Sequence, residues 1–559
     1  RSFGTVLQLM KDYPEFMFMM SQPQLYEFLK TESPELYEEL KQRVKEGRWE
    51  VEGAMWLESD CNIPSGESFV RQLIHGKKFI RDEFGKESVT LWIPDVFGYS
   101  AALPQILKKA GVKNFVTGKI SWCDVNSMPN DTFYWKGIDG TEIFTHFLTT
   151  KDFNIHTWYP EKTHEYVMFN GMLDPREVKS SYDVYRTKTW NTETLHTFGF
   201  GDGGGGPTYE MLESYRRLEK GLPGIPRTQM STLDSFLERI KNNFDDSCKK
   251  IRETPRWDGE LYLEYHRGTY TSIAQVKRNN RKAEFALRKA ETLDVMNELF
   301  CGGKYSSSDF FGMWRLMCLN QFHDVIPGSA IEPVYKRSNR EYQSIFAKTD
   351  SIIANDIDNI AHNINTDGGI LVYNMNAHEG KGIVEYEGGV YTTENIPPMG
   401  YAVVDKLYSE NHAEITENSI ENKYFRIKFN SMGYMESIYD KREGRELLRE
   451  GELGNELLAY EDYPYHWDAW ELSHYTRLKP HAMDELVSAT EYRNGAAAGI
   501  TFVWKFMEST IKQNVVVYDN IPRIDIENDI DMKQMHIVLK ALFPFNIRTT
   551  KTVSEIQYG

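Results

Sequence analysis

Short apolar runs alternate with amphipathic helical patterns over the first 250 residues. Strand-like runs cover Trp49 to Trp56, Val89 to Ile93 and residues 113–117. Helical spacing follows Ser33-Pro34, covers residues 66–83 and recurs near residues 101–110. Ser33 is predicted to cap the first of these helices, with Pro34 at its first position. The alternation predicts a parallel sheet or barrel with helices outside.

The pattern changes twice farther along the chain. From about residue 268 to 363 the apolar positions follow helical spacing in three stretches, which predicts an antiparallel three-helix bundle. After the break at 366–369, strand signals dominate, at 370–373, 424–429, 501–506 and 515–518. We therefore expect an α/β domain over residues 1–255, a helical domain over 256–365 and an all-β region over 366–559.

Composition narrows the functional classes. The 559 residues are 40% hydrophobic and 26% charged, as in ordinary soluble globular proteins. The 65 Lys and Arg against 82 Asp and Glu give a net charge of −17, which argues against nucleic acid and anionic membranes as partners. No apolar run approaches the roughly 18 residues of a membrane span. Five cysteines without a CxxC pair favour a reducing compartment, so we expect a cytoplasmic protein.

Two aspartates follow predicted strands and are candidates for catalysis. Asp95 comes directly after an apolar strand, where the sites of α/β folds gather, although an Asp that only shapes the turn is an equal alternative. Asp202 lies in a glycine-rich stretch after the apolar run 195–200, and no Walker pattern follows it. Parallel strands would place both carboxylates on one rim. Such a pair can perform glycoside hydrolysis, with retention of configuration if they lie about 5 Å apart.

A histidine and two aromatic stretches add further candidates. His323 lies at the end of the second predicted helix of the helical domain, and it is either a metal ligand with Asp324 nearby or a histidine that favours the helix dipole. Aromatic residues alternate with polar ones over 257–270 and 467–470. This pattern suits stacking on a sugar face and equally suits a half-buried strand. His75, His146 and His266 have no partners at metal-ligand spacing and are predicted to be structural.

Taken together, these segments resemble glycoside hydrolase family 38, the retaining α-mannosidases. The motifs that carry the resemblance lie, in the family's order, at 47–53, 58–67, 92–100, 201–207, 257–270 and 321–329. Their wording is most similar to the bacterial and cytosolic branch. The resemblance implies a multidomain fold of α/β, α and β regions: a seven-stranded-type, barrel-like catalytic domain, a three-helix bundle and a β-sandwich region.

The resemblance also implies an activity and a set of site residues. The expected reaction is the removal of terminal α-linked mannose from oligosaccharides by a zinc-assisted double displacement, in a protein that could also assemble as a homo-oligomer. Asp95 corresponds to the nucleophile and to a zinc ligand, His323 to a zinc ligand, and Asp202 to the acid/base. The residues expected to contact substrate are Asp324, Asn154, Phe153, Asp60 and Tyr265.

One departure from the family pattern affects the metal site. The family's other zinc ligands come from a His-x-Asp motif that should lie shortly before Arg1, and the chain does not contain it. Asp95 and His323 alone fall short of the usual three protein ligands of a catalytic zinc. We expect that the chain is truncated at both ends and that it binds one zinc ion well only with ligands upstream of Arg1. Our hypothesis is that the chain is inactive as it stands. A metal-dependent carbohydrate deacetylase and a catalytically dead carbohydrate-binding protein are the alternatives.

Overall fold

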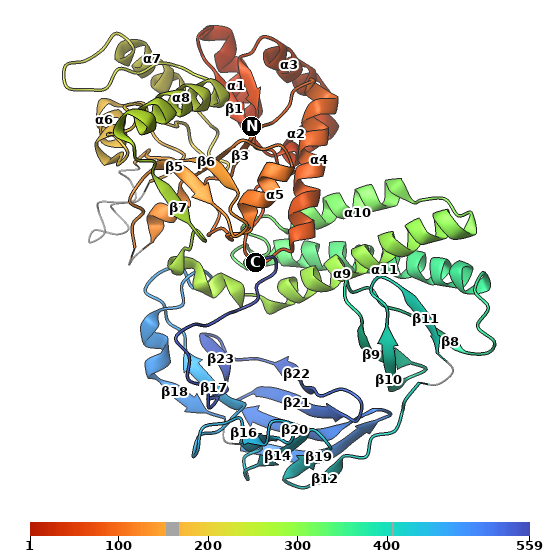
Figure 1. Ribbon diagram of the computed structural model, residues 1–559. Helices are drawn as coiled ribbons and strands as arrows, with labels where there is room; N and C mark the ends of the chain where they lie inside the picture. Colours follow the sequence, from red (N-terminus) through yellow and green to blue (C-terminus); the bar gives the residue numbers. More distant parts are fainter. Residues whose placement is uncertain (124–125, 152–166, 405–406, 484) are drawn as a thin grey trace.

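The computed structural model describes residues 1–559 apart from 124–125, 152–166, 405–406 and 484. Figure 1 shows three regions: an α/β region at the top, a layer of long helices below it, and a strand-rich region at the bottom. The order of the regions along the chain is the one predicted from the hydrophobic pattern.

The α/β region is built on a mixed five-stranded sheet. Its strands, in spatial order, are β3 (Thr90–Trp92), β4 (Asn114–Thr117), β6 (Glu142–Phe147), β5 (Thr132–Lys136) and β7 (Arg256–Asp258). Strands β3, β4 and β6 are parallel to one another, so their carboxyl ends share one edge of the sheet. Two further strands, β1 (Phe18–Met20) and β2 (Trp49–Val51), form a separate parallel pair. The described strands therefore form two sheets, and a seven-stranded barrel stays a prediction.

Helices flank these sheets (Figure 1). They are α1 (Ser2–Asp12), α2 (Pro23–Glu32), α3 (Pro34–Lys45), α4 (Gly66–Phe84), α5 (Leu103–Lys109), α6 (Pro175–Val184), α7 (Tyr209–Leu218) and α8 (Leu233–Ile251), with 3₁₀ segments η1 (Lys119–Trp122) and η3 (Glu264–Tyr270). The helices predicted at 66–83 and 101–110 are confirmed. Ser33 is the N-cap residue of α3 and Pro34 is its first residue, as predicted, although the Ser33 side chain makes no capping hydrogen bond. The strand predicted over Trp49–Trp56 ends at Val51, because the chain turns away at the left-handed Gly53 and Ala54.

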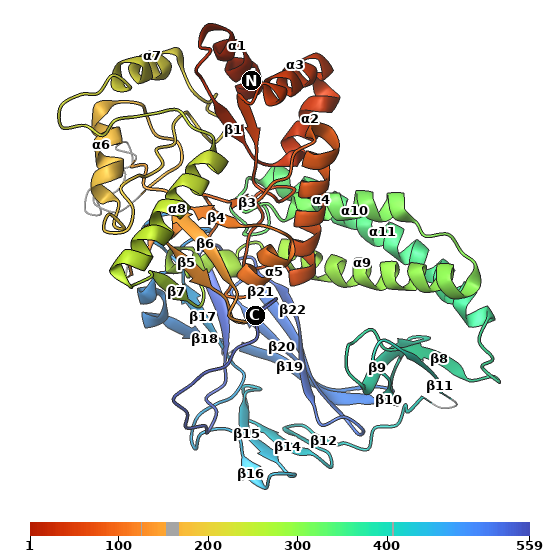
Figure 2. The same ribbon diagram turned by 45° about the horizontal axis from the view of Figure 1, so that its top comes forward.

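Three long helices follow: α9 (Ala274–Cys301), α10 (Ser307–Asn320) and α11 (Glu332–His362). They lie side by side in both views (Figure 2). Their shared core contains Leu287 of α9, Trp314 and Met317 of α10, and Tyr342 and Ile345 of α11. The loop that follows α10 carries His323, so the packing of these helices decides where that side chain lies.

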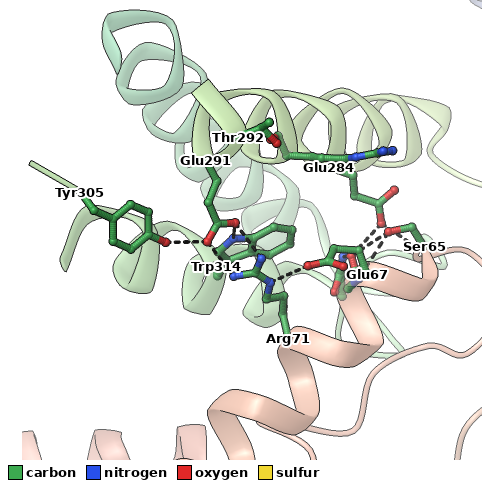
Figure 3. A network of polar contacts seen from close by, with 11 residues as sticks. Ser65, Glu67, Arg71, Glu284, Glu291, Thr292, Tyr305 and Trp314 are labelled. Carbon is green, nitrogen blue, oxygen red and sulfur yellow. Dashed lines mark hydrogen bonds and ion pairs between the residues drawn. The ribbon is translucent and has the colours of Figure 1, made fainter. Parts of the chain in front are cut away.

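A polar network joins the α/β region to these helices (Figure 3). The Arg71 guanidinium on α4 donates to both carboxylate oxygens of Glu291 on α9, at 3.0 and 2.7 Å. The same carboxylate accepts from the Tyr305 hydroxyl at 2.7 Å and from the Trp314 indole at 3.2 Å. Glu291 thus has four donors from three segments, and it fixes α4 against α9 and α10.

A second group of contacts extends this network toward the loop after α10. The Glu284 carboxylate on α9 accepts from the Ser65 backbone N–H at 2.7 Å and from the Ser68 hydroxyl at 2.9 Å. The Gln321 side-chain amide in turn donates to the Ser68 hydroxyl at 2.9 Å. These buried contacts join the start of α4 to the residues just before His323.

Strands dominate after residue 366, as predicted. They are β8 (Ile370–Tyr373), β9 (Gly380–Tyr386), β10 (Gly389–Ile396), β11 (Tyr401–Val404), β12 (Glu414–Thr416), β13 (Ser419–Glu421), β14 (Phe425–Phe429), β15 (Met435–Asp440), β16 (Arg445–Glu446), β17 (Glu456–Glu461), β18 (Pro480–Ala482), β19 (Glu485–Asn494), β20 (Ala497–Phe506), β21 (Ser509–Tyr518), β22 (Ile524–Asp531) and β23 (Ile537–Leu542), with the 3₁₀ segment η4 (His474–Leu478). The sheets β12–β16 and β19–β22 share one core, in which Phe429 and Phe502 pack at 4.9 Å between ring centroids.

The last residues return to the α/β region, where both views place the C-terminus close to α5 (Figures 1 and 2). The Tyr558 hydroxyl donates to the Cys61 carbonyl at 2.6 Å, and its ring packs on Phe69 of α4. The β region is therefore attached to the α/β region through a segment distant in sequence.

Candidate active site

Four of the predicted site residues line one cavity of about 640 Å³: Asp95, Asp202, His323 and Asp324. The cavity lies between the carboxyl end of β3, strand β1, the 195–207 segment and the loop after α10. Side chains from segments more than 200 residues apart thus meet at one place, and Glu58 joins them.

Asp95 is held rigidly just beyond β3. All three residues of β3 are buried, and the Pro94 carbonyl accepts from the backbone N–H groups of Gly118 and Lys119 at 3.1 and 2.9 Å. These bonds tie the end of β3 to the end of β4. The Lys119 Nζ atom lies 2.7 Å from Asp95 Oδ1, in an ion pair whose lysine is almost fully buried. The prediction that Asp95 lies at the carboxyl end of a strand is confirmed.

Sequence reasoning did not identify Lys119. Its ammonium group lies 4.1 Å from the ring centroid of Trp122, 4.9 Å from that of Trp470 and 5.6 Å from that of Phe97. Aromatic faces and one carboxylate therefore replace the water that an exposed lysine would keep. A usable signal existed, because Lys119 follows the predicted strand 113–117 and so belongs to the same rim as Asp95.

His323 is oriented by the backbone of the Glu58 segment. Its Nδ1 lies 2.8 Å from the Glu58 carbonyl oxygen, and its backbone N–H donates to the same oxygen at 3.2 Å. Since a carbonyl only accepts, Nδ1 carries the proton, and Nε2 of the neutral ring keeps a free lone pair. That Nε2 atom lies 3.8 Å from a carboxylate oxygen of Asp95 and 3.8 Å from one of Asp324.

A short antiparallel contact fixes the His323 segment from both sides. Ser59 and Phe322 form an isolated β-bridge, and the Asp60 N–H donates to the Gln321 carbonyl at 2.9 Å. The loop after α10 is therefore bonded to the α/β region by its backbone, so the position of His323 does not depend on side-chain contacts alone.

The residues present fit a metal ion. One ligand atom each from Asp95, His323 and Asp324 can lie within 4.8 Å of the others, and imidazole with carboxylates is a donor set that zinc accepts. A backbone carbonyl on the far ring nitrogen is the usual outer contact of a metal-bound histidine. Burial lowers the pKa of His323, but the surrounding carboxylates, Asp95 first, raise that pKa more, so the net shift is upward.

Asp202 lies on a different kind of structure. The predicted strand at 195–200 does not form: Phe198 makes an isolated bridge with Gly171, and Phe200 makes another with Gly206 around a tight turn. Asp202 lies at the exposed tip of this turn with a positive φ of 51°. Although the residue is exposed, neighbouring atoms partly desolvate its carboxylate, and this, followed by the charge of Asp95, raises the pKa of Asp202 above its ordinary value. The glycines of the turn favour this irregular backbone over a strand.

Glu58 is a second residue that sequence reasoning missed as a site residue, although its motif was noted. Its carboxylate accepts from the Ser21 hydroxyl at 2.9 Å and from the Gln22 side chain at 3.3 Å. Burial raises the pKa of Glu58 to about 7, and the charges of Asp95 and Asp202 contribute to the rise. Glu58 therefore adds a protonatable carboxyl group to the cavity wall.

The remaining predicted substrate contacts lie elsewhere. Asp60 is buried outside the cavity lining, where its Oδ1 accepts from the backbone N–H groups of Asn62 and Ile63. Tyr265 is buried in the core behind Asp95, beside His266, and does not line the cavity either. Phe153 and Asn154 lie outside the described residues. For these four residues substrate binding stays a prediction.

Comparisons with known proteins agree with this architecture. The family models described as glycosyl hydrolases family 38 N-terminal domain, alpha mannosidase middle domain and glycosyl hydrolases family 38 C-terminal domain match residues 1–260, 264–360 and 420–559. In the described residues we find no helix that is long and apolar enough to cross a membrane.

Two curated relatives and one solved structure show the extent of the similarity. Alpha-mannosidase G of Dictyostelium discoideum is 32% identical over the whole chain and 55% of its own length. Alpha-mannosidase 2C1 of Homo sapiens is 32% identical over the whole chain and 53% of its own length. The chain thus spans about half the length of the curated relatives it matches. An alpha-mannosidase from Enterococcus faecalis V583 shares the fold, with a TM-score of 0.76 at 15% identity over 98% of this chain and 72% of that one.

Three consecutive family models along the chain, relatives aligned over all of it and a solved structure with the same fold agree with the motifs around Asp95 and His323. The chain belongs to glycoside hydrolase family 38.

Proposed function

We propose that the protein is a retaining exo-α-mannosidase that removes terminal α-linked mannose from oligosaccharides by a zinc-assisted double displacement. The observation that carries this proposal is the meeting of Asp95 and Asp202 in one cavity beside the cluster of Asp95, His323 and Asp324. The relatives' names support the choice of mannose, since those matched over the whole chain are called alpha-mannosidases.

The two carboxylates take complementary roles in this reaction. Asp95 attacks the anomeric carbon, and the ion pair to Lys119 holds its Oδ1 while Oδ2 points toward His323. Asp202, whose pKa is raised, donates a proton to the leaving glycosidic oxygen. In the second step Asp202 accepts a proton from water, the resulting hydroxide attacks the same carbon, and Asp95 is released.

Zinc would be held by Asp95 and His323, with Asp324 as the third member of the cluster or as a partner for a substrate hydroxyl. When bound, the ion would act as a template for the sugar hydroxyls and would stabilise charge. We infer that further ligands come from upstream of Arg1. Residues that precede Arg1 in a longer protein would enter beside this site, because Ser2 lines the cavity.

The experiment is to measure zinc content and hydrolysis of an activated aryl α-mannoside, for this chain and for one extended upstream. The proposal expects stoichiometric zinc and turnover in the extended chain, with weak zinc binding and little turnover in this one. Absence of both zinc and turnover from both chains, with mannobiose bound but unchanged, would favour a carbohydrate-binding protein without catalytic activity.

Finer expectations belong to the same proposal. None of the five cysteines, all of which lie within the described residues, forms a disulfide, and three of them are buried, which supports a cytoplasmic protein. For this family we expect three features of architecture. The N-terminal strands close into a barrel, α9–α11 form a bundle, and the β12–β16 and β19–β22 sheets form a sandwich. Assembly into a homo-oligomer is tested by the mass of the protein in solution.

A further inference from the structure

An aromatic segment of the β region lies next to the candidate active site. It connects β17 to β18, and it carries five aromatic residues other than histidine: Tyr463, Tyr465, Trp467, Trp470 and Tyr475. The ring of Trp470 packs on His266 at 4.6 Å and on Phe97 at 5.6 Å, and it lies 4.9 Å from Lys119 Nζ. Trp470 thus contacts the lysine that is paired with Asp95.

The backbone of this segment is fixed to the α/β side of the molecule. The Gly268 N–H donates to the Trp470 carbonyl at 2.7 Å, and the Ser272 hydroxyl donates to the Ala469 carbonyl at 2.9 Å. A Cβ atom at Gly268 would lie 2.9 Å from that Trp470 carbonyl oxygen, so the close approach requires glycine. The turn therefore holds a defined position relative to Asp95.

Trp467 extends the aromatic surface outward. Its ring lies 5.2 Å from the ring of Trp470, and 40% of the residue is exposed. Its φ of 59° lies in the left-handed region, which is rare for a bulky residue and concentrates at functional sites. The Trp467 carbonyl accepts from the backbone N–H groups of Trp470 and Glu471 at 2.8 and 3.0 Å, which holds the turn closed.

One donor in this turn is unused. The indole Nε1 of Trp470 is buried and makes no hydrogen bond to any residue that the structure describes. An exposed tryptophan face beside an unpaired indole N–H suits a ligand with an apolar face and hydroxyl groups at its edge. A pyranose ring has this chemistry. Three successive side-chain contacts of 2.7, 4.9 and 5.2 Å connect Asp95 to Trp467 through Lys119 and Trp470. Lys119, Trp470 and Trp467 lie beside the cavity lining rather than in it, so the turn is placed for a sugar adjoining the reacting one.

We propose that the Trp467–Trp470 turn is the subsite for the leaving-group sugar of the substrate, with the Trp467 ring stacked on the apolar face of that sugar. The proposal rests on the glycosidase function proposed above, and it assigns a substrate-binding role to the β region.

The test compares two substrates in the zinc-loaded complete protein. One is α-mannosyl fluoride, whose leaving group is a single atom, and the other is α-linked mannobiose in its 1,2, 1,3 and 1,6 forms. Trp467→Gly suits the native backbone and removes the ring, so it is expected to fold; Trp467→Asn is a second variant that tolerates a positive φ. Tyr386→Ala, at a similarly exposed aromatic residue of β9, is the matched control.

Both Trp467 variants are expected to raise KM for the preferred mannobiose about tenfold relative to KM for α-mannosyl fluoride, whereas Tyr386→Ala leaves that ratio unchanged. An unchanged ratio in Trp467→Gly and Trp467→Asn would overturn the subsite while the proposed function stands. Asp95→Asn separates the two proposals. If that variant still hydrolyses both substrates at the original rate, the proposed function fails and the subsite fails with it.

Discussion

The two carboxylates proposed for catalysis, Asp95 and Asp202, are held in opposite ways. Asp95 follows a fully buried strand, and backbone bonds from the end of the neighbouring strand and an ion pair to buried Lys119 fix it. Asp202 lies at the exposed tip of a glycine-rich turn, with a left-handed backbone of its own. One group is placed by the sheet and the other by a local turn.

This difference matches the tasks proposed for the two groups. A nucleophile that also contacts a metal requires a fixed position, because errors of about 1 Å at a reacting atom are costly. An acid/base meets leaving groups that differ between substrates, and it exchanges protons with water in the second step. A turn at the cavity edge provides that access to water. As a result, the position of Asp202 depends on the glycines of the turn rather than on the sheet, and its pKa depends on neighbouring charges.

We expect the largest effect on the rate of hydrolysis from substitution of Asp95, the carboxylate that the sheet holds in place. Asp95→Asn keeps the shape of the side chain but removes the attacking oxygen anion and the partner of Lys119. In the upstream-extended, zinc-loaded protein we expect kcat/KM for α-mannosyl fluoride to fall on the order of 10⁴-fold or more, as for other covalent nucleophiles. Asp82→Asn on the surface of α4 is the control and should leave the rate unchanged. More than a tenth of the original rate in Asp95→Asn would assign the nucleophile elsewhere.

We expect the second-largest effect from substitution of Asp202 in the glycine-rich turn. Asp202→Ala is expected to lower kcat for mannobiose by about 10² to 10⁴, the usual contribution of a general acid–base residue. With α-mannosyl fluoride, which needs no proton on its leaving group, the mannosyl-enzyme should accumulate, because water is no longer activated. Mass spectrometry of the quenched protein detects the added hexosyl group. Without an adduct on Asp95, either the assignment of Asp202 or the retaining mechanism is wrong.

The third prediction concerns zinc binding by His323, whose Nε2 atom lies beside Asp95. His323→Ala removes the free Nε2 lone pair beside Asp95 and should weaken zinc binding by about 100-fold or more, since even outer contacts of such sites contribute 10 to 100-fold. Competition with a chromogenic chelator measures the affinity in the complete protein. His362→Ala, at the exposed end of α11, is the control. Equal zinc affinity in both variants would remove His323 from the metal site.

We expect the smallest effect, a loss of stability, from substitution of Glu291, which joins α4 to α9 and α10. Glu291→Ala leaves Arg71, Tyr305 and Trp314 without their shared acceptor, and it should lower the free energy of unfolding by about 1–3 kcal/mol for this partly exposed network. Urea denaturation followed by fluorescence measures the shift. Glu67→Ala removes an exposed partner of the same arginine within α4 and should cost about 0.5 kcal/mol or less. Equal shifts would mean that the network does not join the two regions.

The sequence was a good guide where one element decides the outcome. The helices at 66–83 and 101–110, the strands near Asp95 and the change from helices to strands after residue 366 follow from periodicity and local breaks. Asp95 was placed correctly because the end of a buried strand is a local feature. The 195–200 run misled, because Phe198 packs in the cores beside β1 and α7 without forming a ladder. Ser33 takes the predicted N-cap position of α3 but makes no side-chain hydrogen bond there.

The sequence by itself determined the order of the three regions, the family motifs and the positions of Asp95 and His323 within their segments. Only the tertiary structure decided that the Glu58 carbonyl sets the tautomer of His323, that Lys119 pairs with Asp95, and that Trp470 reaches this pair from the β region. The physical reason is separation along the chain. Periodicity reports which face of one element is buried, whereas these contacts join residues that lie between 24 and 351 positions apart and depend on how whole regions pack.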